Sequence, residues 1–248
     1  MNGKSPLLSQ FPCHRSAEPV TAPDTFTTGA VILMDKPRNW TSFDVVKFVR
    51  RRIPPKKVGH AGTLDPLADG LLILCTGKAT KAISQIQEME KEYRAVVRFG
   101  SSTPSFDAAT EPDQYGNWEH LSEEMIRQEL DREFTGEIQQ VPPIYSALKS
   151  GGRRLYEIAR KGEVVKIEPR KVIIHEIIIE EVALPELTLT IRCGKGTYIR
   201  SLAHDLGIQL GSRAHLASLR RTKTGSFHVT DAVTPQQFEK QTENLKDG

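Results

Sequence analysis

The 248-residue sequence has few cysteines, no long apolar run and no spacing typical of a metal site. Its three cysteines, Cys13, Cys75 and Cys193, lie far apart and form no Cys-x-x-Cys pair, which favours a cytoplasmic protein with reduced thiols. No run approaches the roughly 18 apolar residues of a membrane span, so no membrane partner is expected. The seven histidines lack a zinc-like spacing. If the protein is an enzyme, we expect its chemistry to need neither a metal nor a cofactor.

Nucleotide-binding loops are also lacking. Two Gly-Lys pairs, at 77–78 and 194–195, are followed by Ala79 and Gly196, whereas a P-loop requires Ser or Thr there to hold magnesium. No G-x-G-x-x-G follows a predicted strand, so the sequence gives no support for a dinucleotide site.

The basic residues are gathered in clusters, although the net charge is only +3. Residues 45–57 carry six basic side chains and no acid, residues 149–171 carry eight against three acids, and residues 220–223 form a third cluster. The balancing acids concentrate at 119–137. Such segregation suits a polyanion whose phosphates are held by Lys and Arg. Charge alone leaves open that these runs are merely solvated faces.

The pattern of apolar residues, Gly and Pro predicts an ordered α+β chain after a leader. Residues 1–28 are rich in Pro, Ser and Thr and are expected to be disordered. Strands are predicted at 30–34, 71–75, 93–99, 171–182, 187–193, 216–220 and 225–229. Helices are predicted at 41–52, 78–90, 122–134, 155–161, 198–210 and from Pro235. The first would begin with a capping box, because Asp44 stands three residues after Thr41. Because strands come in adjacent pairs, we expect a mixed, largely antiparallel central sheet flanked by helices.

One predicted loop, residues 58–70, has the composition of a functional site. Asp65 follows two glycines and directly precedes Pro66, which restricts Asp65 to an extended backbone. Such a carboxylate is held in place while it stays accessible. An isolated Asp-Pro is more often a simple turn, so the wider string decides its meaning.

That string, G-H-A-G-T-L-D-P-L-A-x-G, resembles the catalytic loop of the TruB family, the tRNA pseudouridine-55 synthases of the bacterial type. The resemblance covers the chain from about Gly29 to Phe238. Five further segments are similar to motifs of that family: 35–37 with 41–42, 91–94, 142–149 with 155–160, 193–200, and 219–222.

The resemblance implies the pseudouridine synthase catalytic fold over residues 29–240, with an RNA-arm-binding insertion around 136–165. It implies an isomerase that converts the T-loop uridine at position 55 of tRNA to pseudouridine, with Asp65 as the essential carboxylate. Its partner would be the T stem-loop, and the protein would act as a monomer without an obligatory protein partner. The implied substrate-binding residues, which extrude the target base and hold it, are His60, Tyr93, Tyr198, Arg200 and Leu219.

Each implied role has a chemical reason. A carboxylate at the sugar could add covalently or take a proton from C2′, and the sequence leaves both routes open. The implied pairing of Arg200 with Asp65 would keep the carboxylate ionised. Tyr93 would stack on the flipped uracil and remove the C5 proton, while His60 would fill the gap in the RNA stack. Tyr198 and Leu219 would line the pocket.

The chain departs from the family pattern in three places. Asn39 stands where glycine is usual, in a turn that Asn can still adopt. Pro104 replaces an aspartate, which puts the polar network of that loop in doubt, although Asp107 remains. Residues 241–248 read as a tail, so the PUA domain of many members is expected to be absent.

Two alternatives remain beside this interpretation. One is the guide-RNA-dependent relative that works inside a ribonucleoprotein. The other is an RNA-binding or RNA-folding protein without catalysis, which the basic clusters would fit equally well. Substitution of Asp65 by Asn separates catalysis from binding.

Overall fold

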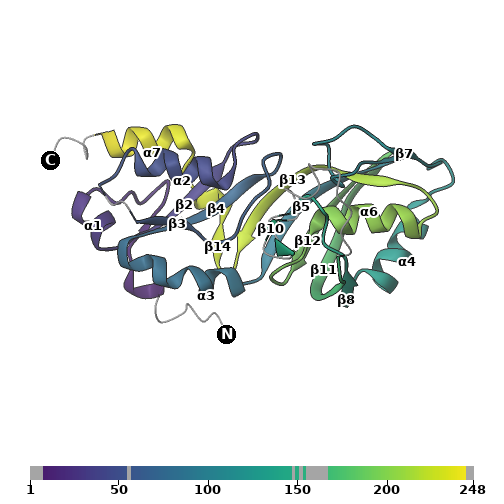
Figure 1. Ribbon diagram of the computed structural model, residues 1–248, viewed down its shortest axis with the longest axis horizontal. Coiled ribbons are helices and arrows are strands. Elements are labelled where there is room, and N and C mark those ends of the chain that lie inside the picture. The colour runs from purple at the N-terminus through teal and green to yellow at the C-terminus, as the bar shows by residue number, and fades with distance from the viewer. Residues whose placement is uncertain (1–7, 55–56, 147–148, 151–152, 155–166, 244–248) are drawn as a thin grey trace. The chain divides into compact units, whose positions relative to one another are not determined.

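The computed structural model describes residues 8–54, 57–146, 149–150, 153–154 and 167–243 (Figure 1). The chain divides into two compact units, one made of residues 1–93 with 220–248 and the other of residues 94–219. The helix predicted at 155–161 lies outside the described residues, as do residues 155–165 of the predicted RNA-arm-binding insertion.

The first unit is built on a buried antiparallel strand pair. β2 (Val31–Lys36) runs against β4 (Asp69–Thr76), with Val31 opposite Cys75 and Lys36 opposite Gly70. Both strands are apolar almost throughout because side chains on both faces are buried. β1 (Cys13–His14) pairs with β2. β4 also pairs with β3 (Val58–His60) and with the C-terminal part of β13 (Ala214–Thr224), which in turn pairs with β14 (Phe227–His228).

Helix α2 (Ser42–Arg50) begins where the sequence predicts. The Thr41 hydroxyl accepts a hydrogen bond from the Asp44 amide, and the Asp44 carboxylate accepts one from the Thr41 amide, which makes the predicted capping box. The other helical segments of this unit are η1 (Leu8–Gln10), α1 (Pro23–Thr28), η2 (Gly77–Ala82), α3 (Ile83–Glu88), η3 (Val229–Asp231) and α7 (Pro235–Thr242).

Residues 8–28 depart from the expectation of a disordered leader. β1 pairs in parallel with β2, and the side chains of Leu8, His14 and Phe26 are buried. The His14 ring lies 5.8 Å from that of Phe26 and 5.1 Å from that of Phe238. The order comes from a few apolar anchors separated by polar residues, a pattern too sparse for helix or strand periodicity to detect.

The loop predicted at 58–70 also differs, because its first three residues form β3 on the edge of β4. Gly59 allows this strand to come close to α3, since a Cβ at that position would lie 2.8 Å from Ile83 Cδ1. A three-residue strand that contains glycine has no alternation to reveal it.

The second unit holds the remaining long strands. β5 (Lys91–Phe99) alternates buried and exposed residues as predicted. β11 (Arg170–Ala183) pairs antiparallel with both β12 (Glu186–Cys193) and β8 (Gly136–Gln140). Its helices are α4 (Glu123–Glu133) and α6 (Ile199–Gln209), and its short strand pairs are β6 (Ser101–Ser102) with β7 (Gln114–Tyr115) and β9 (Lys149–Ser150) with β10 (Arg153–Arg154).

Ten of the described strands form one sheet with the main order β1-β2-β4-β13-β5-β12-β11-β8, and the pairs β6–β7 and β9–β10 are separate from it. Strands β5 and β13 each pass from one unit into the other along the chain. The pairings of β4 with β2 and β3, of β11 with β8 and β12, and of β13 with β14 are antiparallel, whereas those of β1 with β2 and of β13 with β4 are parallel. The predicted α+β fold, with a mixed and largely antiparallel sheet flanked by helices, is therefore confirmed. Within the described ranges, no helix has the length and apolar character needed to span a membrane.

Candidate active site

The loop that carries Asp65 connects β3 to β4. At its start, the Ala61 amide donates to Ile73 O at 2.8 Å, and at its end the Ala68 amide donates to Asp65 O at 3.1 Å. Leu64 and Ala68 are buried, whereas Asp65 between them is partly exposed. The predicted loop position of Asp65 is therefore confirmed, with apolar neighbours anchoring the backbone on either side of this partly exposed residue.

Ser42 at the start of α2 fixes the residue before Asp65. Its buried hydroxyl accepts a hydrogen bond from the Leu64 amide at 2.9 Å and donates one to the Leu64 carbonyl at 3.2 Å. One side chain thus satisfies both polar groups of a buried peptide segment, as a neighbouring strand would do. Because α2 is itself capped by Thr41, the helix start and the Asp65 loop hold each other in place.

The residue after Asp65 is fixed from the other side. The Pro66 carbonyl accepts hydrogen bonds from the Asn39 amide at 2.7 Å and from Lys36 Nζ at 3.5 Å. Asn39 has a φ of 68°, so it adopts the left-handed conformation expected of it in place of glycine. The turn therefore survives this departure from the family pattern.

Lys36 provides a cation beside the loop. It is the last residue of β2, its side chain is 0% exposed, and its ammonium also donates to Pro37 O at 3.0 Å and Trp40 O at 2.6 Å. Burial lowers the pKa of Lys36 to about 8, against the attraction of the Asp69 and Asp65 carboxylates, which raises it. No role of its own was predicted for this lysine from the sequence. Its signal was the position of the lysine directly before Pro37 in the motif 35–37.

Arg221 holds the first half of the loop. Its buried guanidinium donates from Nε to Leu71 O at 2.7 Å, from Nη2 to Gly62 O at 3.3 Å and from Nη1 to Thr63 O at 3.5 Å. Gly62 has a φ of 97°, which only glycine adopts without strain. The loop backbone is thus tied to β13 as well as to α2.

The third basic cluster, at 220–223, makes contacts within the chain. Arg220 makes a bidentate ion pair with Asp35, at 3.1 and 2.7 Å, and also contacts Asp69 Oδ1 at 2.7 Å. Lys223 pairs with Glu92 at 2.9 Å. Arg221 is buried, and the other two cations form ion pairs within the chain, so all three support the fold here; a part of this cluster in a polyanion-binding surface stays a prediction.

His60 and Tyr93 are the other predicted site residues in this unit. His60 ends β3 and is half-buried; burial lowers its pKa below the ordinary value, and the Arg221 guanidinium lowers it further. The imidazole is therefore neutral near neutral pH. Tyr93 lies on the buried face of β5, with Ala95 and Val97 on the same face.

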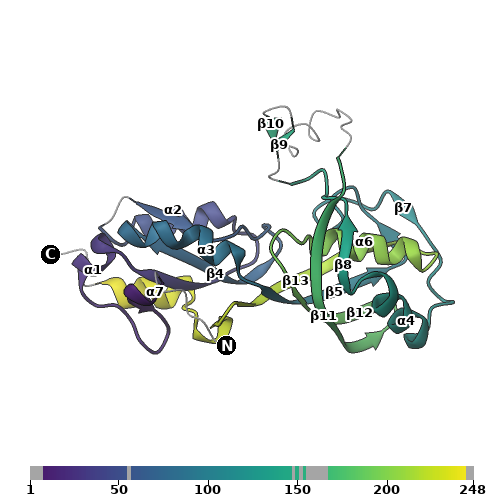
Figure 2. The ribbon, with the colours of Figure 1, turned by 90° about the horizontal axis from the view of Figure 1, so that it is seen from below.

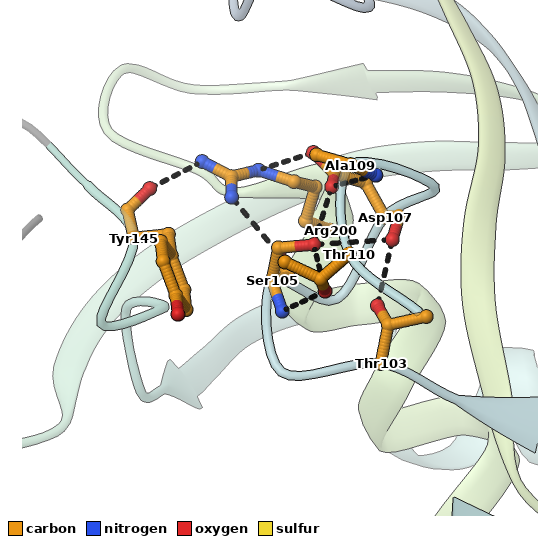
Figure 3. Close-up of polar contacts among 7 residues, drawn as sticks. All are labelled: Thr103, Ser105, Asp107, Ala109, Thr110, Tyr145 and Arg200. Atoms are coloured by element: carbon orange, nitrogen blue, oxygen red, sulfur yellow. Dashed lines mark hydrogen bonds and ion pairs between the residues drawn. The ribbon is translucent and has the colours of Figure 1, made fainter. Parts of the chain in front are cut away.

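The second unit places Arg200 in a polar network, shown in Figure 3. Arg200 is the second residue of α6 and is 4% exposed. Its Nη1 donates to Ser105 O at 2.9 Å, its Nη2 donates to Tyr145 O at 3.0 Å, and its Nε lies 3.6 Å from Asp107 Oδ2. A planar guanidinium held at three nitrogens has a fixed direction.

Pro104 does not disrupt this network. Asp107 Oδ1 accepts from Ser105 Oγ at 2.6 Å and from the Ala109 amide at 3.0 Å, while Thr103 Oγ1 donates to Asp107 O at 2.7 Å. Hydroxyl groups thus supply the hydrogen bonds of the loop, and Asp107 is kept in place without the missing aspartate. The doubt raised by the sequence is removed for this part of the site.

Phe106 attaches the same loop to α6. It has a φ of 62°, and its ring stacks on His204 with a centroid distance of 3.8 Å and an interplanar angle of 14°. His204 lies one helical turn beyond Arg200. The Leu216 amide of β13 donates to Phe106 O at 2.9 Å. This stack, which motif comparison missed, supports the loop that orients Arg200.

Tyr198 and Leu219 complete the predicted set. Tyr198 is the N-cap residue of α6; its amide donates to Gln140 Oε1 at 2.8 Å, and its carbonyl accepts from Gln140 Nε2 at 3.0 Å. The Arg170 guanidinium lies 4.8 Å from the centre of its ring. Leu219 is a half-buried residue of β13. His60, Asp65 and Tyr93 thus belong to the first unit, and Tyr198, Arg200 and Leu219 to the second.

Two family models together match residues 50–248 of the chain. Residues 50–199 match the N-terminal domain of TruB family pseudouridylate synthases, and residues 200–248 match a tRNA pseudouridylate synthase B C-terminal domain. The chain belongs to the TruB family of pseudouridylate synthases. It is therefore an isomerase that makes pseudouridine from uridine, and the family resemblance predicted from its motifs is confirmed.

Named relatives support the same family assignment. A protein of Flavobacterium johnsoniae called tRNA pseudouridine synthase B is 49% identical over 224 residues, which cover 88% of this chain and 97% of that protein. One of Phocaeicola vulgatus with the same name is 47% identical over 86% of this chain and 93% of that protein. A solved archaeal box H/ACA sRNP Nop10–Cbf5 complex contains a chain that is 28% identical with a TM-score of 0.66, over 90% of this TruB-family chain and 56% of that one.

Proposed function

We propose that this chain isomerises the T-loop uridine at position 55 of tRNA, with Asp65 as the catalytic carboxylate. The observation that supports tRNA as the substrate is the similarity to two relatives called tRNA pseudouridine synthase B, which this chain matches at 47–49% identity over nearly their whole length. The Cbf5-containing complex is more distant, at 28% identity, and this chain spans 56% of its matched chain. We therefore favour action on tRNA in the cytoplasm, as a monomer without a guide RNA or protein partner.

The chemistry fits a partly exposed carboxylate on a loop whose backbone is held on both sides. Pseudouridine formation breaks the N1–C1′ bond, turns the uracil and joins C5 to C1′, while C5 loses a proton and N1 gains one. Asp65 acts at the sugar, either by adding to C1′ or by taking a proton from C2′. Both routes use the ionised carboxylate, which the nearby Lys36 ammonium favours.

The remaining site residues would handle the flipped nucleotide. Tyr93 offers an aromatic face for the uracil and a phenol that could receive the C5 proton. Arg200, held by its carbonyl partners and Asp107, would pair with Asp65 when the site is assembled. Tyr198 and Leu219 would line the pocket, and the neutral ring of His60 would take the place of the extruded base in the RNA stack.

The test is tritium release from C5 of uridine-labelled, unmodified tRNA, with the purified chain as the only protein. Wild type should release tritium and Asp65→Asn should release none, while both bind tRNA with similar affinity. Asp131→Asn, which makes the same change on exposed α4, is the matched control and should be fully active. Release by Asp65→Asn would overturn the catalytic assignment.

Substrate and partner requirements can be read in the same assay. Replacing the T-loop uridine by cytidine should abolish release if that position is the target. If wild type is inactive alone but becomes active with a guide RNA and partner proteins, the guide-dependent alternative is correct. If it binds tRNA but is inactive under every condition, the binding-protein alternative is correct.

A further inference from the structure

The loop between β6 and β7 is attached to α6 at two places one helical turn apart (Figure 2). At the first place, Ser105 O and the Asp107 carboxylate contact the Arg200 guanidinium. At the second, the ring of Phe106 stacks on that of His204. Because Phe106 stands between the two loop residues that contact Arg200, any movement of its backbone moves both contacts.

The backbone of Phe106 lies in a conformation that is unfavourable for a side chain of this size. Its φ is 62°, in the left-handed region that bulky residues rarely occupy. Such a conformation persists only where the surrounding contacts over-determine it. Two hydrogen bonds hold it: the Phe106 amide donates to Thr103 O at 3.0 Å, and its carbonyl accepts from the Leu216 amide at 2.9 Å. The stack on His204 is the third contact, and it joins this turn to the helix that carries Arg200.

The ring of His204 is suited to stacking rather than to proton transfer. The two rings are nearly parallel, with 14° between their planes and 3.8 Å between their centres. The Nδ1 atom of His204 is buried without a hydrogen-bond partner in the described part of the chain. Burial lowers the pKa of His204, against a smaller effect of Asp113, which raises it, and with a further lowering by Arg213. The imidazole is therefore a neutral aromatic ring near neutral pH.

These contacts give α6 a second hold on the loop that directs its own arginine. We propose that His204 is a positioning residue for pseudouridine formation, because its stack on Phe106 fixes the loop that aims Arg200. The catalytic part of this inference rests on the proposed pairing of Arg200 with Asp65. A displaced guanidinium would pair less well with the carboxylate, so loss of the stack should slow the chemical step and leave RNA binding nearly unchanged.

The first test follows the Arg200 side chain without RNA. In a ¹⁵N NMR spectrum of the full-length protein, the Nε–Hε signal of Arg200 is identified by its loss in Arg200→Lys. This signal should exchange slowly with water in wild type and in His204→Phe, which keeps a flat neutral ring. In His204→Leu, which keeps an apolar side chain but has no ring, it should exchange about two- to tenfold faster, the factor that loss of an aromatic pair implies.

The second test is the single-turnover rate of tritium release from labelled tRNA at saturating protein. His204→Leu should lower this rate about two- to tenfold without a matching loss of tRNA affinity, whereas His204→Phe should keep the wild-type rate. Phe106→Leu should be slowed as His204→Leu is, and the double variant should be no slower than either, because both changes remove one contact. His175→Leu makes the same change at an exposed histidine of β11 and should match wild type in both tests.

Two results would overturn the proposal: His204→Phe as impaired as His204→Leu, or an Arg200 signal that His204→Leu leaves unchanged. A fall in tRNA affinity equal to the fall in rate would also reject it, since His204 would then act in binding. Thermal melting shows whether each variant is folded, and Phe106→Leu tests the same contact if His204→Leu is not. If wild type releases no tritium, the proposed T-loop activity fails, and the Arg200 signal still decides whether His204 holds the guanidinium.

Discussion

Replacing Ser42 by alanine tests whether the Asp65 loop is held as the structure indicates. The substitution removes a hydroxyl that makes two hydrogen bonds to the backbone of Leu64, the residue before Asp65. Leu64 is buried, so water cannot easily replace these bonds. Each lost bond costs about 1 kcal/mol, and a buried group left without a partner costs about 1–3 kcal/mol.

We therefore expect Ser42→Ala to lower the free energy of unfolding by about 2–4 kcal/mol. Because the loop then loses its fixed direction, the rate of tritium release at saturating tRNA should also fall, while the affinity for tRNA changes little. Urea unfolding followed by circular dichroism measures the first effect, and single-turnover kinetics of tritium release measures the second.

Ser122→Ala is the matched control, since Ser122 also precedes a helix and its hydroxyl accepts one exposed hydrogen bond from the Met125 amide at 3.3 Å. It should lose about 0.5–2 kcal/mol of stability, as for an ordinary N-cap, without a change in rate. If Ser42→Ala matches this control in both measurements, the hydroxyl does not position the loop. A stability loss without a rate loss would show that Leu64 is held for folding alone.

Two further predictions concern charged groups. The pKa of Lys36 is lowered from 10.5 to about 8, so between these pH values the unfolded chain keeps a proton that the folded chain has released. The stability of wild type relative to Lys36→Met, measured by urea unfolding, should therefore rise with pH across this window. A constant difference would refute the pKa shift. Lys47 and Arg51 of the first basic cluster are exposed, so their joint replacement by Gln should reduce the slope of log affinity for tRNA against log salt by about 1.4–1.8. The control Arg52→Gln should leave this slope unchanged, because Arg52 already pairs with Glu239 at 2.5 Å. Equal slopes for wild type and the double variant would exclude that part of α2 from phosphate binding.

Local patterns were sufficient for much of the fold. The capping box of Thr41 and Asp44 located the start of α2, and the alternation from 93 to 99 located β5. The Gly- and Pro-rich string around Asp65 located the candidate catalytic loop. These features depend on residues within a few positions of one another, so their physical cause is contained in a short segment of sequence.

Contacts between distant segments could not be predicted in this way. The hydroxyl of Ser42 meets Leu64 across 22 positions, and Arg200 meets Ser105 across 95. Neither the residue types nor their spacing identifies such a pair, because Ser and Arg have many possible partners. The short strands β1 and β3 were missed for the same reason, since each is stabilised by a partner strand rather than by its own pattern.

The basic residues show what this limit means for function. Arg52, Arg221 and Lys47 all belong to clusters that suggested phosphate binding, yet Arg52 is paired with Glu239 and Arg221 is buried against loop carbonyls. Lys47 is exposed, with its ammonium 4.7 Å from the Phe43 ring. A cation that already has its partners inside the protein would have to break those contacts to bind a phosphate. Only cations such as Lys47 can neutralise RNA at little cost, so the structure, rather than the count of basic residues, decides how strongly salt should weaken binding.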